Sequence, residues 1–262
     1  MKTGLMPVIF LGHGSPMNAI ETNDFTNTLS QLGEKIPTPT AILCISAHWL
    51  TEGTWVTHMP HPRTIHDFYG FPKELSRIQY PAVGSPMLAE LIKITTQKTK
   101  INLDNDIWGL DHGTWSVLRH IYPEANIPIV QLSIYLEQPA SYHYQIGTQL
   151  KILRQRGILI VGSGNIVHNL QKIIWGVQPK PYDWAIEFDD WVKNKLIARD
   201  FNALTSHYLD SESGQLSVPI PDHYFPLLYV LGASDEHDKL HFEYEEIQNG
   251  SISMRSLSYG LS

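Results

Sequence analysis

Cysteine is nearly absent from this sequence: the 262-residue chain contains one, Cys44. A single cysteine excludes an internal disulfide and any zinc site built from several cysteine ligands. Because Cys44 lies in the middle of an apolar run, we expect a small buried core residue and not a reactive thiol. This cysteine usage is typical of a cytoplasmic protein.

Charge and long apolar runs are also scarce. Charged residues make up 17% of the chain, the net charge is −7, and no basic run occurs, which argues against nucleic acid or an anionic membrane as a partner. No apolar segment approaches the length of about 18 residues that a membrane span needs. The first strand-like run begins at Val8, which leaves no room for a signal peptide. We therefore expect a cytoplasmic monomer or small homo-oligomer whose partner is a small molecule.

What the chain does contain is a regular alternation of apolar runs and amphipathic segments. It is 42% hydrophobic, which is enough for a sizeable core, and no repeat or linker-like segment interrupts it. The alternation predicts a single α/β domain over residues 1–262, with a central mostly parallel or mixed sheet flanked by helices. Asn249-Gly250 predicts a β-hairpin near the end. Helices are expected over residues 25–32, 85–99, 115–121, 140–154 and 181–199, with another starting at Asp222.

Three of the predicted strands end at or just before a histidine. The apolar runs and their histidines are residues 8–11 with His13, 40–47 with His48, and 157–164 with His168. In an open α/β sheet, ligands bind at the carboxyl ends of the strands, and neutral imidazole is a common metal ligand. A single histidine after a strand is more often a hydrogen-bonded structural residue. Three cases of one pattern, in a chain with 13 histidines, favour a mononuclear metal site at this edge as strongly as they favour structural histidines.

A long loop over residues 58–72 combines three prolines, three histidines and three aromatic rings. Long structured loops in compact domains usually act as lids or binding loops, and apolar rings beside polar groups suit an aromatic ligand. Tyr69 is a candidate to cover a substrate ring, whereas Arg63 and His66 are candidates to meet a substrate carboxylate. The alternative is a loop that only packs on the surface.

Six short motifs, in order along the chain, resemble those of one known family. They are Gly12-His13-Gly14-Ser15-Pro16, Ser46-Ala47-His48-Trp49, Asp67-Phe68-Tyr69-Gly70-Phe71-Pro72, Asp111-His112-Gly113, Gly162-Ser163-Gly164-Asn165 with His168-Asn169-Leu170, and Asp222-His223-Tyr224. The set is similar to that of the 4,5-DOPA extradiol dioxygenases. These are class III extradiol ring-cleaving enzymes related to protocatechuate 4,5-dioxygenase. Each motif alone is weak, but six in sequence are specific.

The resemblance implies a non-haem Fe(II) enzyme that opens a catechol ring beside its two hydroxyls with O2. It implies that His13, His48 and His223 are the metal ligands. His168 would be the acid/base histidine, or a fourth ligand, and His112 a second pocket histidine near oxygen and substrate. Protocatechuate-type relatives use a glutamate where this chain has His223. Since three neutral imidazoles also bind Zn(II), zinc is possible at the same site.

Two other functions remain open from the sequence. A zinc hydrolase with a metal-bound water would keep the metal, but such enzymes usually have a carboxylate beside it. In this sequence only Asp111 and Asp222 stand close to the candidate histidines. A non-enzymatic metal-binding relative is the second alternative. Among dioxygenase substrates, the preferred prediction is a catechol with a short para side chain, such as DOPA, while the position of cleavage stays open.

Overall fold

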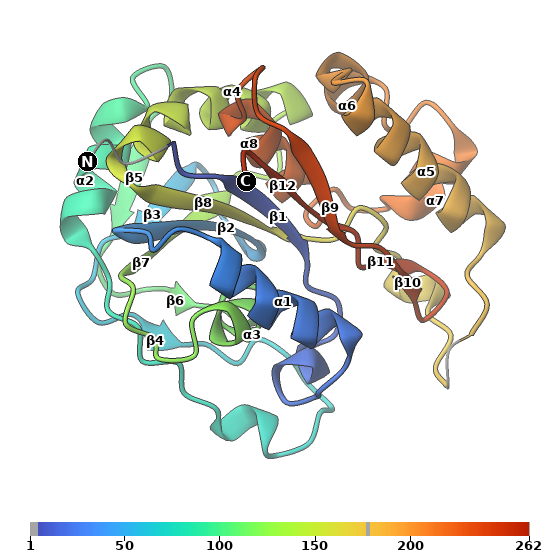
Figure 1. Ribbon diagram of the computed structural model, residues 1–262, viewed down its shortest axis with the longest axis horizontal. Helices are drawn as coiled ribbons and strands as arrows, with labels where there is room; N and C mark the ends of the chain where they lie inside the picture. Colours follow the sequence, from blue (N-terminus) through green and yellow to red (C-terminus); the bar gives the residue numbers. More distant parts are fainter. Residues whose placement is uncertain (1–4, 177–178, 262) are drawn as a thin grey trace.

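A computed structural model describes residues 5–176 and 179–261 and contains one eight-stranded sheet (Figure 1). Its central strands pair in parallel, and both edges include antiparallel pairs, so the predicted mixed, mostly parallel α/β sheet is confirmed. In order across the sheet the strands are β5 (Ile101–Asp104), β3 (Thr54–Thr57), β7 (Ile129–Ile134), β2 (Ala41–Leu50), β8 (Ile158–Gly164), β1 (Val8–Gly12), β12 (Ser256–Tyr259) and β9 (Leu240–Tyr244).

The central strands are apolar on both faces because helices cover both. In β1, Val8 and Phe10 enter one hydrophobic core, whereas Ile9 and Leu11 enter the other. This alternation between faces explains why the strands read as continuous apolar runs. Cys44 of β2 is fully buried in the same way, and burial raises the pKa of its thiol to about 12, as expected for an inert core residue.

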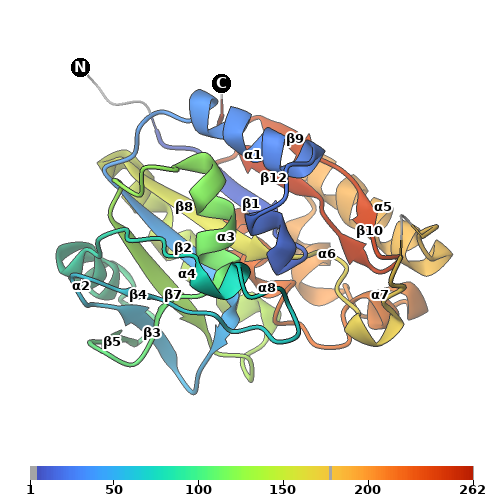
Figure 2. The ribbon, with the colours of Figure 1, turned by 90° about the horizontal axis from the view of Figure 1, so that it is seen from below.

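The helices form two layers, one on each side of the sheet (Figures 1 and 2). One layer consists of α1 (Asp24–Lys35) and α3 (His112–Ile121). The other consists of α2 (Pro86–Thr95), α4 (Ala140–Leu150), α5 (Asp183–Ile197), α6 (Phe201–Ser206), α7 (Glu212–Ser217) and α8 (Phe225–Ala233). In the part of the chain that the structure describes, no helix is both long and apolar enough to cross a membrane.

Short elements complete the fold around the loops. Two-residue strands pair as β4 (Arg63–Thr64) with β6 (Gly109–Leu110), and as β10 (Ile247–Gln248) with β11 (Ile252–Ser253). Single 3-10 turns are η1 (Pro16–Ala19), η2 (Leu75–Arg77), η3 (Lys151–Arg156) and η4 (Leu170–Lys172). The predicted hairpin is confirmed: Asn249 and Gly250 have φ values of 53° and 76°, the left-handed conformation that a tight β10–β11 turn requires.

Several element boundaries differ from the predictions for local reasons. Helix α3 begins at His112 and not at residue 115, because the Asp111 side chain caps it by accepting a hydrogen bond from Thr114 N. Helix α2 ends at Thr95, where the Thr96 hydroxyl bonds back to Ile92 O. His223 lies before α8 and not in its first turn, since the helix begins only at Phe225. The first of these differences places His112 at a helix N-terminus.

Candidate metal centre

Three of the candidate histidines come together because the strands that carry them are neighbours. Strands β2, β8 and β1 lie side by side in parallel, so their carboxyl ends share one edge of the sheet. His13 directly follows β1, His48 lies near the end of β2, and His168 follows β8. The structure therefore places these three histidines at the same edge, as the strand pattern indicated.

His223 reaches that edge from the loop before α8. Its backbone oxygen accepts a hydrogen bond from Asn165 N at 2.9 Å, which attaches the loop to the end of β8. Gly164 permits this approach, because a Cβ atom there would lie 2.1 Å from His223 O. The glycine-rich end of β8 thus brings a fourth histidine, distant in sequence, to the site.

Five histidines line one cavity of about 660 Å³: His13, His48, His112, His168 and His223. Two groups of three residues each offer possible ligand atoms that all lie within 4.8 Å of one another inside the group. The first is His13, His48 and His112, and the second is His168, Asp222 and His223. Proximity alone therefore does not select one set of metal ligands, and ring orientation must decide.

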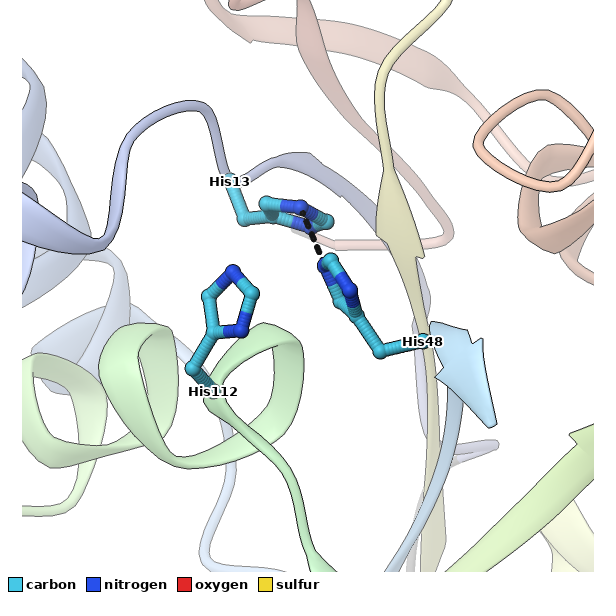
Figure 3. Close-up of side chains that lie close together, drawn as sticks. All are labelled: His13, His48 and His112. Atoms are coloured by element: carbon cyan, nitrogen blue, oxygen red, sulfur yellow. Dashed lines mark hydrogen bonds between the residues drawn. The ribbon is translucent and has the colours of Figure 1, made fainter. Parts of the chain in front are cut away.

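Hydrogen bonds orient His13 and His48 so that their Nε2 atoms face each other. Ser163 Oγ donates its proton to Gly113 O, so it accepts from His13 Nδ1, 3.0 Å away. His48 Nδ1 lies 3.3 Å from Asp67 Oδ2, which favours a proton on that nitrogen too. Both Nε2 atoms then present lone pairs, at a separation of 3.1 Å (Figure 3). Two facing lone pairs suit a shared cation better than a hydrogen bond.

The ring positions of His13, His48 and His223 fit a single metal ion. Their centroids form a nearly equilateral triangle with sides of 5.0, 5.2 and 5.0 Å. Three imidazoles bound to one ion at about 2.1 Å would have centroids about 4.6–5.3 Å apart, for angles between about 90° and 109°. The centroids of His48 and His112 are only 3.9 Å apart, too close for this arrangement. The residues present therefore fit a metal.

Burial keeps three imidazoles of this site neutral. It lowers the pKa of His13, His48 and His168 well below the ordinary value, and repulsion between neighbouring histidines lowers it further. Because metals bind the neutral form of imidazole, these rings are in the state that a ligand requires.

His168 stacks on His223 and does not point at the same position. The two ring centroids are 3.4 Å apart and the ring planes differ by 10°. Imidazole binds a metal through a lone pair in the plane of its ring, so two parallel stacked rings cannot both bind one ion from these positions. This geometry favours the acid/base role of His168 over the role of fourth ligand.

Asp67 connects two of the histidines and was not among the predicted site residues. Besides its contact with His48, its Oδ1 lies 3.0 Å from His112 Nδ1 and accepts a hydrogen bond from His112 N at 2.9 Å. Burial works to raise the pKa of this carboxyl, but the contacts with His112 outweigh burial and hold the pKa below its ordinary value. Asp67 is the one acidic residue of the loop over residues 58–72, a signal that could have singled it out.

The structure places one of the three predicted substrate residues at the cavity. Tyr69 lines it and is 94% exposed, so its ring stands at the mouth. Arg63 and His66 are not among the residues that line the cavity, and their role toward a substrate stays a prediction. The short strand β4 directs Arg63 to Ile107 O, and His66 Nε2 is bonded to Ile78 O at 2.9 Å. Both side chains are therefore committed to structural contacts.

Comparison with known proteins gives one consistent family. Residues 7–255 match the family described as the catalytic LigB subunit of aromatic ring-opening dioxygenase. A 4,5-DOPA dioxygenase extradiol of Escherichia coli (strain K12) is 47% identical over 99% of this chain and 97% of its own. One of Beta vulgaris is 35% identical over 98% of each chain. The crystal structure of an uncharacterized Escherichia coli K12 protein, 44% identical, matches with a TM-score of 0.85 over 97% of this chain and 99% of its own. The resemblance carried by the six motifs is thereby confirmed.

Proposed function

Because the chain belongs to the LigB family of aromatic ring-opening dioxygenases, we propose that it opens the ring of a catechol such as DOPA with O2. The proposal takes residues 1–262 as one catalytic domain and Fe(II) as the cofactor, held by His13, His48 and His223. The observation that carries it is the nearly equilateral triangle of these three imidazoles at one edge of the sheet. The family implies a non-haem metal, and three neutral imidazoles suit a divalent ion.

When bound, Fe(II) would lower the pKa of the catechol hydroxyls and hold catechol and O2 beside each other. The chain supplies the remaining parts of the reaction. Ser163 and Asp67 fix the Nδ1–H tautomers of His13 and His48, which keeps their Nε2 lone pairs directed at the ion. These two residues therefore position ligands and do not react themselves.

His168 is the proposed acid/base. It lines the cavity beside the third ligand, and burial keeps it neutral, so its ring can accept the proton that leaves a catechol hydroxyl. The same nitrogen can return that proton to a substrate oxygen when the ring opens. His112, paired with Asp67, is the second proton-handling group on the other side of His48.

The walls of the cavity suit a flat aromatic substrate. Phe68, Tyr69 and Phe71 approach from the loop over residues 58–72, and Trp175 comes from the segment after η4. Phe68 packs edge-on against His112 with centroids 5.6 Å apart, which connects the aromatic wall to the histidine cluster. Apolar rings beside a polar cluster would cover the faces of the substrate ring and leave its hydroxyl-bearing edge to the ion.

Anaerobic loading with Fe(II), followed by a panel of catechols in air, tests the proposal. Ring opening should produce a coloured product, measured by visible absorbance, only in iron-loaded protein. The same protein loaded with Zn(II) is the matched control, since zinc fits the three imidazoles but cannot exchange electrons with O2. Iron-loaded protein that changes no catechol would overturn the proposal and favour the hydrolase alternative. Cytoplasmic location and a monomeric or small homo-oligomeric state also remain proposals.

A further inference from the structure

Among the described residues, no permanently cationic side chain lines the cavity to meet an anionic substrate. Among the residues lining it, all within the described ranges, there is neither lysine nor arginine. Arg63, the expected partner of a substrate carboxylate, is directed to Ile107 O outside the cavity. The charged side chains that do line it are two carboxylates, Asp67 and Asp222. A negatively charged ring substituent would therefore lose its hydration without gaining a side-chain counterion.

The two carboxylates are not equivalent. Asp67 is shared between His48 and His112, so both of its oxygens are occupied. Asp222 contacts His223 through Oδ1 only, accepting a hydrogen bond from His223 N at 2.7 Å and lying 3.1 Å from His223 Nδ1. Within the described residues its Oδ2 makes no hydrogen bond or ion pair, and 19% of the side chain is exposed.

Exposed aromatic rings stand at the mouth of the same cavity. Trp175 is 75% exposed and Tyr69 is 94% exposed, and both belong to its lining. The face of an aromatic ring attracts an ammonium group, as a carboxylate does. Gln248 and Asn249 also line the cavity and carry neutral amides.

We infer that this cavity selects catechols whose short side chain carries an ammonium group, recognised by Asp222 and the aromatic mouth, and rejects catechols with an anionic side chain. The inference rests on the proposed function, because it concerns the substrate class of the same site. On this basis an amine without a carboxylate is the best substrate, a zwitterion such as DOPA is accepted through its ammonium group, and a carboxylate alone is the worst.

Three catechols with side chains of similar length separate charge from size: dopamine, 4-ethylcatechol and 3,4-dihydroxyphenylacetate. We expect kcat/KM for dopamine to exceed that for 3,4-dihydroxyphenylacetate by about ten-fold or more, with 4-ethylcatechol between them. Anaerobic affinity for the iron-loaded protein should follow the same order. Added salt should weaken the preference for dopamine without changing turnover of the neutral catechol.

Asp222→Asn tests the assigned residue, with Asp106→Asn as a control that makes the same chemical change at an exposed position outside the cavity. Asp222→Asn should reduce the ratio of dopamine to 3,4-dihydroxyphenylacetate turnover several-fold, whereas Asp106→Asn should leave that ratio unchanged. The rate with each charged catechol is divided by the rate with 4-ethylcatechol in the same preparation, which corrects for any change in metal content.

The outcomes distinguish the inference from the proposed function. If wild-type protein uses 3,4-dihydroxyphenylacetate as well as dopamine, the charge selection is wrong while the dioxygenase function stands. If the preference exists but survives in Asp222→Asn, the assignment to Asp222 is wrong. If iron-loaded protein opens DOPA but not dopamine, the charge selection is wrong while the dioxygenase function stands; if it opens neither DOPA nor any of the three catechols, the proposed function itself fails, and the inference fails with it.

Discussion

The Nε2 atoms of His13 and His48 lie 3.1 Å apart, and each ring has its Nδ1 atom turned to a different partner. Ser163 and Asp67, those partners, come from a strand end and from a loop that are distant in sequence. Two imidazole lone pairs aimed at one point are unfavourable unless a cation lies between them. This relationship connects the histidine cluster to a metal centre more directly than the number of histidines does.

Replacement of individual histidines should separate ligands from neighbours. We expect His13→Ala, His48→Ala and His223→Ala to lose bound Fe(II) or Zn(II), because each removes one of three protein ligands. His112→Ala should keep the metal, since its ring lies too close to His48 to share the ion. Metal content after dialysis is the measurement, with the exposed His207→Ala as control. Loss of metal from His112→Ala but not from His223→Ala would show that His112, and not His223, is the third metal ligand.

The role of His168 predicts a different pattern. His168→Ala should retain the metal but slow catechol turnover by about 10²–10⁴-fold, the usual contribution of an acid/base group. Steady-state rates and metal content, measured on the same preparation, separate the two effects. A variant that loses its metal as readily as His13→Ala would instead make His168 a ligand.

Asp67 should act through the histidines that it contacts. In Asp67→Asn the amide can face the His48 Nδ1–H group in two ways. Its NH2 group would place two donors against each other, and its neutral oxygen would accept a weaker hydrogen bond than the carboxylate does. Metal affinity or activity should fall by about 10- to 100-fold, as is usual for partners of ligating histidines. Asp106→Asn is again the matched control. Full metal affinity and full activity in Asp67→Asn would show that the contact is incidental.

The sequence predicted those parts of the fold and site that depend on local patterns. Apolar runs ending in Gly12-His13 and Ser46-Ala47-His48 identified two strand ends, because strands buried on both faces read as continuous apolar segments. Asn249-Gly250 identified the hairpin from its backbone conformation alone. In each case a few neighbouring residues determine the outcome.

What depends on tertiary packing was less predictable. Asp67 is important because its loop folds against α3, a contact between residues 45 positions apart that no local pattern encodes. Pairing of β4 with β6 places Arg63 where its guanidinium donates to Ile107 O, a contact that the sequence around Arg63 does not reveal. The stacking of His168 on His223 likewise depends on how the loop before α8 meets the end of β8.

A histidine outside the site should make folding stability sensitive to acid. His143 of α4 is fully buried against α8, with Nδ1 2.9 Å from Tyr229 Oη, and burial lowers its pKa to about 3. Folding therefore favours the neutral form of His143. The contribution of this neutral form to the free energy of unfolding is fully present above the unfolded pKa of about 6.5 and is lost as the pH falls toward 3. Acidification from about pH 7 to about pH 4.5 should therefore lower the free energy of unfolding by about 2–3 kcal/mol through this group.

Urea unfolding of metal-free wild type and His143→Gln at both pH values measures this loss. The variant is less stable at neutral pH, because it disturbs the stack on Phe225, but its stability should fall less on acidification. The quantity to compare is the change in unfolding free energy between the two pH values. An equal change in both proteins would show that His143 does not contribute to the acid sensitivity.

Oxygen consumption with DOPA and with tyrosine, measured side by side on the iron-loaded protein, tests the central claim most directly. The two substrates differ by one ring hydroxyl, so only DOPA can bind the ion through two adjacent oxygens. We predict uptake of one O2 for each DOPA consumed, with formation of the coloured ring-opened product and no uptake with tyrosine. Tyrosine turned over as fast as DOPA, or no oxygen uptake with DOPA in protein shown to hold iron, would contradict the account.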